Sequence, residues 1–361
     1  MPCVSCLVAA RNSASVAKVF QSSGVGSYNR CPGFGPSHEY CSATPLLGRN
    51  PLKSELNASV AFAQSYPDRP LKLILGFPPG GNVDLVGRLI AQKLAEGLGQ
   101  QVIVENRVGA GTMIGNDYVA KAAADGYTLL LVSGAHVTLA ATQRKLPYDS
   151  VRSFAFISSI VTYPTVISVR PDSKYKSLAE LIADARANPG KLNYPSPGVG
   201  TFYHLTGELL NSLAGIEMTH VPYRGGFEPV TDLLAGRVDV LMDALTSSWP
   251  NIRAGKLRPL AVASPEAVLS LPNVPLAAQT VPGLESVSFS GLAAPAGTPT
   301  PIIERLNREV RAAVDSAELR ARFNNAGGNA VATSPEAFQR LVETEIAKWR
   351  NVVETRKIQF P

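Results

Sequence analysis

Residues 71–98 read LKLILGFPPGGNVDLVGRLIAQKLAEGL, and this stretch decides the fold class. The mostly apolar run Leu71–Leu75 is typical of a buried strand. Apolar residues at helical spacing then predict a helix over Val83–Leu98, which Gly99 ends. The turn between the two holds Pro78-Pro79-Gly80-Gly81. A strand that leads through a glycine-rich turn into an amphipathic helix is one βα unit of an α/β protein.

The same alternation continues after this unit. Strands are predicted at 101–105 and 127–132, around a helix at 113–123. A β-α-β-α-β order predicts a parallel sheet with right-handed crossovers. A β-rich stretch at 154–170, which we expect to break at Pro164, leads into a second α/β series. Its predicted helices are 178–187, 202–213, 227–234 and 248–254, and its predicted strands are 192–194, 217–221, 238–242 and 258–263.

The C-terminal part returns to a strand-like run at 287–294, followed by helical patterns at 301–325 and 335–355. We therefore predict two α/β domains connected by two hinge crossings, near 165–170 and 286–292, with a ligand cleft between them. Domain 1 would comprise 66–168 and 288–361, domain 2 would comprise 169–287, and 1–65 would be a leader.

Composition and charge exclude several classes of protein. The chain has 361 residues, of which 45% are hydrophobic and 17% charged, enough to bury a sizeable core. Residues 1–65 hold five basic and two acidic residues, which is half of the net charge of +6. A net +3 over the remainder, with no basic cluster interleaved with aromatic residues, argues against nucleic acid as a partner.

The leader has a composition of its own, rich in Ser, Gly, Asn and Pro. All four cysteines lie in the first 41 residues, so the folded body has no cysteine for catalysis or metal binding. Ala61-Phe62-Ala63-Gln64 resembles a signal-peptidase site, although no apolar region of sufficient length precedes it. Either the export signal is degenerate or the natural start lies elsewhere. We expect a periplasmic location.

Polar or glycine-rich turns follow four of the predicted strands, where ligands of open α/β sheets bind. Gly80 and Gly81 leave backbone amides unobstructed before a helix whose positive end favours an anion. Thr201 is a plausible N-cap, which would place His204 near the same helix end. The other two are the loop Ser133–Gln143 and the turn Tyr223-Arg224-Gly225. A plain turn, a packed histidine and a solvated arginine remain alternatives at these positions.

One motif is typical of an enzyme. Gly109–Gly115 reads GAGTMIG, a GxGxxxG that opens a helix and resembles a dinucleotide loop. It follows the second strand, however, and no acidic residue ends the next strand to bind a ribose. A glycine-rich turn packed close to the sheet is the favoured interpretation. The four histidines have no metal-ligand spacing, and Asp243 at a strand end could contact a ligand or cap a helix.

Taken together, these segments resemble the Bug/TctC family of extracytoplasmic solute receptors. The resemblance runs from about Tyr66 to Phe360 and rests on short segments in a fixed order. They include Phe77-Pro78-Pro79-Gly80-Gly81 with Asp84, Ala124–Leu130, Leu146-Pro147-Tyr148-Asp149, Val221–Gly226 and Ala294–Pro299.

The resemblance implies a type II periplasmic-binding-protein fold that holds a small carboxylate between its domains. It also implies membrane transporter subunits as partners, and neither a cofactor, a metal nor catalysis. We expect a monomer. The implied ligand contacts are Phe77, Gly80, Gly81, Asp84, Ser133, Ser196, Gly200, Thr201, His204, Tyr223, Arg224, Gly225 and Asp243. The alternatives are an NAD(P)-dependent oxidoreductase that uses Gly109–Gly115, and a ligand-sensing domain for a signalling partner.

Overall fold

The structure is a computed structural model that describes residues 66–143, 145–223 and 228–360. The chain divides into two units, Met1–Val60 and Ala61–Pro361, and the described helices and strands belong to the second unit. The predicted leader therefore lies outside the described residues.

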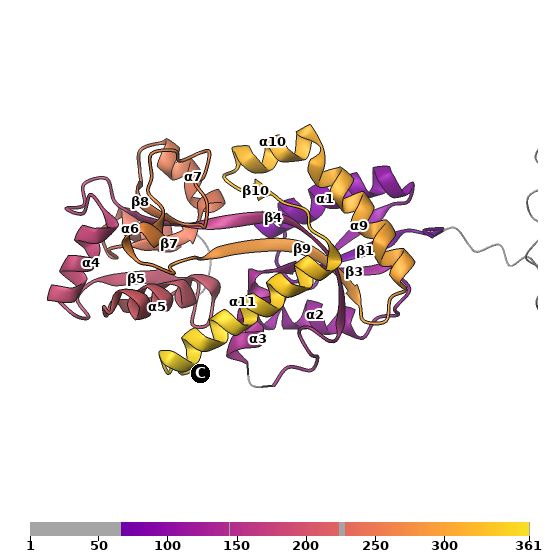
Figure 1. Cartoon of the computed structure of the whole chain (residues 1–361), viewed down its shortest axis with the longest axis horizontal. Coiled ribbons are helices and arrows are strands. Elements are labelled where there is room, and N and C mark those ends of the chain that lie inside the picture. The colour runs from indigo at the N-terminus through magenta and orange to yellow at the C-terminus, as the bar shows by residue number, and fades with distance from the viewer. Residues whose placement is uncertain (1–65, 144, 224–227, 361) are drawn as a thin grey trace, which may run out of the picture. The chain divides into compact units, whose positions relative to one another are not determined.

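The first group of elements is built on a mixed sheet, whose strands run in the order β10-β4-β9-β3-β1-β2 (Figure 1). β1, β2 and β3 are parallel, as predicted, and β9 joins β3 in the antiparallel direction. The strands are β1 Leu71–Leu75, β2 Val102–Asn106, β3 Thr128–Ser133, β4 Phe154–Val169, β9 Val287–Pro295 and β10 Asn329–Ala330. The helical elements are α1 Asn82–Leu98, η1 Ala110–Thr112, α2 Met113–Ala120, α3 Gly134–Thr142, α9 Thr300–Asp315, α10 Ala317–Asn325 and α11 Pro335–Thr355.

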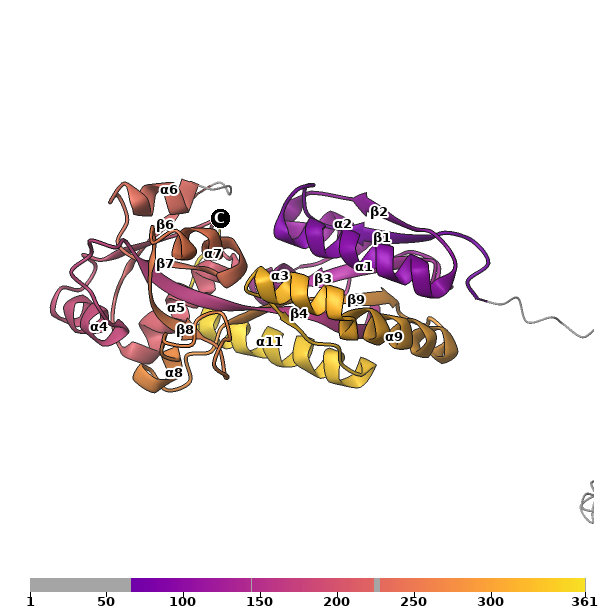
Figure 2. The ribbon, with the colours of Figure 1, turned by 90° about the horizontal axis from the view of Figure 1, so that it is seen from above.

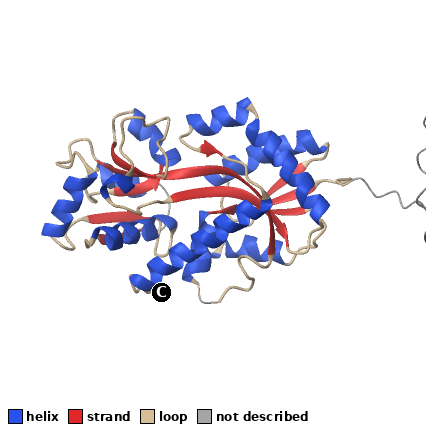
Figure 3. Ribbon diagram, in the orientation of Figure 1, coloured by secondary structure: helices blue, strands red, loops and turns tan. Residues whose placement is uncertain are grey.

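The second group surrounds the C-terminal end of β4 (Figure 2). β7 Leu241–Ala244 and β8 Arg258–Ala263 both pair with β4, and β5 Asn193–Ser196 pairs in parallel with β6 Thr219–Pro222. Its helices are α4 Leu178–Ala187, α5 Phe202–Ala214, α6 Glu228–Leu234, α7 Leu245–Arg253 and α8 Ala277–Thr280. Helices and strands alternate in both groups, as Figure 3 shows, which gives the predicted α/β class.

Two long strands, β4 and β9, connect the groups. β4 pairs with β9 up to Pro164, which lies opposite Val287. From Thr165 onward β4 pairs instead with β7 and β8. The predicted break at Pro164 is therefore wrong, because the strand continues to Val169. A proline has no N–H to donate, and here it stands at the point where β4 changes partners, so it does not interrupt the strand.

Three further expectations about elements need correction. Residues 133–143, expected as a loop, form α3, whose apolar and small residues lack a clear helical stripe. The pattern at 301–325 is two helices, because Ser316 ends α9 and its Oγ accepts a hydrogen bond from the N–H of Leu319 to cap α10. The helix predicted at 248–254 is α7, which begins at Leu245, three residues earlier than predicted, and contains Pro250.

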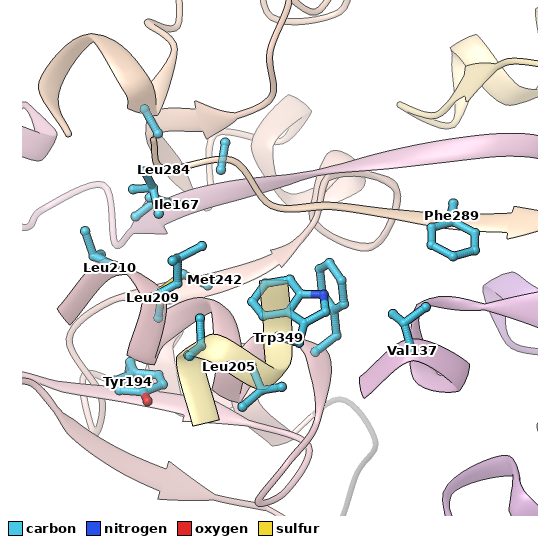
Figure 4. Close-up of a cluster of buried hydrophobic side chains, with 14 of the residues drawn as sticks. Val137, Ile167, Tyr194, Leu205, Leu209, Leu210, Met242, Leu284, Phe289 and Trp349 are labelled. Atoms are coloured by element: carbon cyan, nitrogen blue, oxygen red, sulfur yellow. The ribbon is translucent and has the colours of Figure 1, made fainter. Parts of the chain in front are cut away.

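A hydrophobic cluster joins the two groups (Figure 4). It includes Val137 from α3, Leu205 from α5, Met242 from β7 and Phe289 from β9. Trp349 of α11 is fully buried among them, and its ring centroid lies 5.0 Å from that of Phe202. The C-terminal helix is thus packed into both groups. Within the described residues, no helix combines the length and the apolar character that a membrane span requires.

Candidate ligand-binding cavity

A cavity of about 480 Å³ lies between the two groups of elements. The turn after β1, one side of α3 along its whole length, the turn before α5, the start of α7 and the two connecting strands all contribute to its wall. Its lining residues are Phe77, Asn82, Val83, Ala110, Gly111, Ser133, Gly134, Ala135, Thr138, Leu139, Thr142, Gln143, Tyr163, Pro197, Val199, Gly200, Thr201, Phe202, Tyr203, Ala244, Ser247, Ser288 and Phe289. The volume is that of a small-molecule site.

Four helices present uncapped N-termini to this cavity. The N-cap residues of α1, α3, α5 and α7 are Gly81, Ser133, Thr201 and Ala244, and no side chain of an N-cap bonds to an amide of its helix. Residues of the first turn of each helix line the cavity. By contrast, α4, α10 and α11 begin at serines whose Oγ atoms accept a hydrogen bond from an amide in the first turn. The cavity therefore receives free N–H groups and the positive ends of helix dipoles.

The walls of the cavity carry no charged side chain among the described residues. Hydroxyl groups of Thr138, Tyr163, Ser247 and Ser288 provide hydrogen-bonding partners, and Phe77, Leu139, Phe202 and Phe289 provide apolar contacts. A negatively charged ligand would thus be held by backbone amides and hydroxyls, in the way that helix N-termini bind anions elsewhere.

Four of the predicted site residues line the cavity: Phe77, Ser133, Gly200 and Thr201. They come from the turns after β1, β3 and β5, so the structure brings together three of the four turns that the sequence singled out. Gly80 and Gly81 belong to the same turn as Phe77 but do not line the cavity. Gly80 adopts φ +89°, a conformation that favours glycine.

Asp84 does not line the cavity and instead holds the turn before α1 in place. Its Oδ2 accepts hydrogen bonds from Gly80 N–H at 3.0 Å and Arg88 Nε at 2.9 Å. Its Oδ1 accepts from Arg88 Nη2 at 3.0 Å and Asn106 Nδ2 at 2.9 Å. The hydrogen bonds from Arg88, and those from Gly80 and Asn106, lower the pKa of Asp84 to about 2 despite its burial. Both oxygens are occupied, which leaves this carboxylate no role as a free ligand contact in the structure.

His204 has the corresponding position in α5. Its Nδ1 accepts a hydrogen bond from Gly200 N–H at 3.1 Å, and the side chain is buried behind the turn. Burial lowers the pKa of His204, so the ring is neutral. The ring packs 4.0 Å from that of His220, whose Nε2 lies 2.6 Å from Ser196 Oγ. Ser196 and His204 thus support the turn from its buried side, and neither lines the cavity.

Tyr223 and Asp243 also lie outside the cavity wall. The hydroxyl of Tyr223 donates to Asp232 Oδ2 at 2.5 Å. Asp243 precedes the N-cap residue of α7 and accepts from Ala244 N–H at 2.8 Å and from Ser248 Oγ at 3.0 Å. Burial raises the pKa of Asp243 to about 6. These contacts hold Asp243 at the start of α7, but its side chain caps no amide of the first turn of that helix. Arg224 and Gly225 lie outside the described residues.

Sequence reasoning missed three sources of lining residues. One is α3, because residues 133–143 were expected to be a loop. The second is the start of α7, which contributes Ala244 and Ser247, and the third is the connecting strands, which contribute Tyr163 and Ser288. A polar residue facing a cavity from a mostly buried strand gives no local signal, although Ser288 lies within one predicted crossing and Tyr163 lies two residues before the other. Asn82 and Val83 could have been found, since they open the helix after the glycine turn.

The GxGxxxG segment packs closely against the end of β1. A Cβ added to Gly115 would lie 3.3 Å from the Cα of Gly76, and one added to Gly76 would lie 2.6 Å from the Cβ of Thr112. Ala110 and Gly111 reach the cavity wall. The segment is therefore a close-packed glycine turn that contributes to the cavity. No group of three or more His, Cys, Asp or Glu that could hold a metal ion is found among the described residues.

Comparison with known proteins places the chain in a family. The model of the tripartite tricarboxylate transporter family receptor matches residues 86–358. The UPF0065 protein in the tcbD-tcbE intergenic region of Pseudomonas sp. (strain P51) is 40% identical over 291 residues, which cover 80% of this chain and 87% of that protein. The chain belongs to the tripartite tricarboxylate transporter receptor family, as the resemblance predicted.

Two solved structures extend the comparison to the fold. Rpa4515 of R. palustris, solved with adipate, shares 37% identity and a TM-score of 0.73, with 81% of this chain and 99% of that chain covered. The periplasmic binding protein BugD shares 30% identity and a TM-score of 0.70, with 81% and 99% covered. These similarities confirm the expected two-domain periplasmic-binding-protein fold, and they do not favour a dinucleotide-dependent enzyme.

Proposed function

We propose that this protein is a periplasmic solute receptor that captures a small carboxylate, and a dicarboxylate in particular, for a membrane transporter. The observation that carries the proposal is the convergence of four uncapped helix N-termini on one cavity with no charged side chain on its described wall. Free amides attract an anion, and the absence of a carboxylate from the described wall removes a repulsive partner.

The arrangement of the N-termini supports two anionic groups on one ligand. α1 and α3 follow β1 and β3 of the first group, whereas α5 follows β5 of the second group. A ligand with a carboxylate at each end could satisfy amides on both sides, and the apolar side chains between them would contact its methylene groups. Rpa4515, which was solved with adipate, has such a ligand. Closure of the two groups about β4 and β9 would then exclude water from the bound ligand.

We propose further that the protein does not catalyse a reaction, acts as a monomer and uses Phe77, Ser133, Gly200 and Thr201 for ligand contact. Hydroxyls, amides and apolar groups make up the described cavity wall. The buried histidines nearby are occupied with the turn or with each other. Membrane transporter subunits are the proposed partners, since receptors of this family serve a transporter.

The most direct test removes one backbone N–H group from the cavity wall. Asn82 is the first residue of α1, and its N-cap Gly81 is extended, so a proline fits at position 82 without disturbing the helix. Asn82→Pro removes the side chain and the N–H, whereas Asn82→Ala removes the side chain alone. A hydrogen bond to a charged group contributes about 1.5–3 kcal/mol. We expect Asn82→Pro to bind adipate at least about 10-fold more weakly than Asn82→Ala by calorimetry.

A neutral analogue provides the matching control on the ligand. Adipamide has the length of adipate without its charges, so wild-type protein should bind it far more weakly. Equal affinities of the two Asn82 variants, together with equal affinities for adipate and adipamide, would contradict anion binding by helix N-termini. Adipate, malate, succinate and citrate in a thermal-shift screen would identify the preferred chain length, because a ligand that binds only the native state raises Tm.

A further inference from the structure

We propose that the C-terminal strap, defined as Arg356–Phe360, positions the turn Pro197–Thr201 and thereby controls how tightly the cavity holds its ligand. This inference rests on the proposed function, because it concerns the same cavity. The strap follows α11, which packs against α3 of the first group and α5 of the second (Figure 1). The turn supplies four residues of the cavity wall: Pro197, Val199, Gly200 and Thr201.

Arg356 anchors the strap to the second group. Its Nε donates to Glu208 Oε2 at 2.8 Å, and its Nη1 and Nη2 donate to the two carboxylate oxygens of Glu217 at 2.8 and 2.7 Å. Glu208 in turn accepts a hydrogen bond from the hydroxyl of Tyr194 at 2.7 Å. The bidentate contact with Glu217 fixes both the orientation and the position of the guanidinium group.

The end of α11 then turns the chain toward the cavity. Lys357 adopts φ +50°, the left-handed conformation of a helix-ending residue. Its N–H donates to the carbonyl of Glu354 at 3.2 Å, and the N–H of Ile358 donates to the carbonyl of Val353 at 3.1 Å. These two bonds define a Schellman motif. The side chains of Val353 and Ile358 both pack against the hydrophobic cluster that joins the two groups. The direction of the strap is therefore set by a regular helix end.

Phe360 contacts the turn at Gly200. A Cβ built on Gly200 would lie 3.2 Å from Cε1 and 3.4 Å from Cδ1 of Phe360, and 3.4 Å from Cγ2 of Thr142. Gly200 and Thr142 both line the cavity, one in each group of elements. Gly200 also adopts φ +79°, so the position favours glycine for its backbone and leaves room for the ring. Phe360 thus supports the cavity wall without lining the cavity.

The turn is held from the opposite side by the second group. His204 Nδ1 accepts the hydrogen bond of Gly200 N–H, and Ser196 Oγ accepts that of Gly198 N–H at 3.1 Å. The hydroxyl of Thr201 donates to the carbonyl of Gly198 at 2.7 Å. These bonds fix the turn from within the second group, and the ring of Phe360 adds a contact at Gly200 from the strap. Loss of the strap should therefore loosen the turn without unfolding it.

The test compares Phe360→Ala and Arg356→Gln with wild-type protein. Calorimetry gives Kd for adipate, and stopped-flow fluorescence gives the dissociation rate. Trp349 is a suitable reporter, because its ring contacts Phe202 of the cavity wall. We expect either variant to raise Kd and the dissociation rate about 10-fold, with Tm within about 2 °C of wild type. The double variant should be no worse than Arg356→Gln, since both residues act through one strap.

Matched controls separate the strap from a general loss of surface contacts. Leu269→Ala removes a side chain that is 90% exposed, and Arg322→Gln breaks an ion pair with Glu318 on α10. Both should bind adipate like wild type. Unchanged Kd and dissociation rate in Phe360→Ala and Arg356→Gln would overturn the inference while leaving the proposed function intact.

If the proposed function is wrong, a different result is expected: wild-type protein binds neither adipate nor the other acids. Amide hydrogen exchange by NMR then still decides the inference, because it needs no ligand. The amide protons of Gly198, Gly200 and Thr201 should exchange several-fold faster in Phe360→Ala than in Leu269→Ala. Equal exchange in these two variants would overturn the role of the strap.

Discussion

Asp84 and His204 hold the same position in two different helices. Each is the third residue of its helix, and each accepts a hydrogen bond from the amide just before the N-cap, Gly80 for Asp84 and Gly200 for His204. In both cases the side chain fixes the turn while the amides of the first helical turn stay free. The structure thus gives these two predicted ligand residues a supporting role, one step behind the surface that would meet a ligand.

Asp84 should stabilise the fold above pH 4 and lose that contribution in acid. The folded-state pKa is about 2, below the ordinary value of 3.8, chiefly because Arg88 bonds to the carboxylate. Its contribution is therefore present above pH 3.8 and disappears as pH falls toward 2. Since Arg88 is half exposed, we expect about 1–2 kcal/mol, less than the full shift implies. Urea unfolding of Asp84→Asn should show this loss at pH 7 and a clearly smaller difference from wild type near pH 2.5, where the unfolded carboxyl is protonated and the folded one begins to be.

Asp172→Asn is the control for that experiment, because Asp172 is 73% exposed and lies 3.6 Å from Arg170. It should unfold like wild type throughout the pH range. A constant difference between Asp84→Asn and wild type from pH 7 to pH 2.5 would contradict the assignment.

His136 should remain neutral well below its ordinary pKa. Its Nε2 lies 2.8 Å from the carbonyl oxygen of Ser150, and its Nδ1 lies 3.1 Å from the side-chain nitrogen Nδ2 of Asn116. Because Asn116 Nδ2 is a donor and the carbonyl is an acceptor, the ring proton is assigned to Nε2. Burial lowers the pKa to about 4. The unfolded chain binds a proton below pH 6.5, so the free energy of unfolding should fall by about 3 kcal/mol between pH 6.5 and 4. NMR of the ring should show no titration from pH 7.5 to 5, and a midpoint near 6.5 would refute this.

Gly291 should be intolerant of any side chain. It lies in β9 opposite Ser159, where a Cβ would come within 2.2 Å of Cζ of Phe338 and 2.6 Å of the carbonyl oxygen of Ser158. The carbonyl belongs to a paired strand and cannot move freely. We expect Gly291→Ala to lower the free energy of unfolding by about 2–3 kcal/mol. Gly81→Ala, where a Cβ meets nothing within 4 Å and φ is −82°, should cost far less in the same urea titration.

Lys357→Gly should stabilise the protein. Lys357 has φ +50° at the end of α11, a conformation that glycine adopts without steric cost. We expect a gain of about 0.5–1 kcal/mol in the free energy of unfolding. Lys357→Ala provides the comparison, since alanine removes the same charge and long side chain but keeps the Cβ. A stabilisation of equal size in both variants would show that the charge, and not the backbone conformation, limits the helix end.

Secondary structure with a strong periodic signal was predictable. β1 and α1 were recovered closely because a buried strand and an amphipathic helix bury apolar groups in distinct patterns. α3 was not, since most of its residues are apolar or small without a clear helical stripe, and the helix packs against the distant α11. The continuity of β4 through Pro164 depends on pairing with residues more than 70 positions away, which local sequence cannot report.

The candidate site likewise combines features that are local in the sequence with features that depend on the folded chain. Sequence by itself determined which turns can expose amides, because glycines, a following helix and a preceding strand are local features. The family resemblance then implied Phe77, Ser133, Gly200 and Thr201 as contact residues within those turns. Tertiary structure alone decided that Asp84 and His204 face their own turns, that Tyr163 and Ser288 face the cavity, and that Phe360 reaches Gly200 across 160 residues. The direction in which a side chain points depends on the groups that compete for it, and chain folding brings those groups together from distant parts of the sequence.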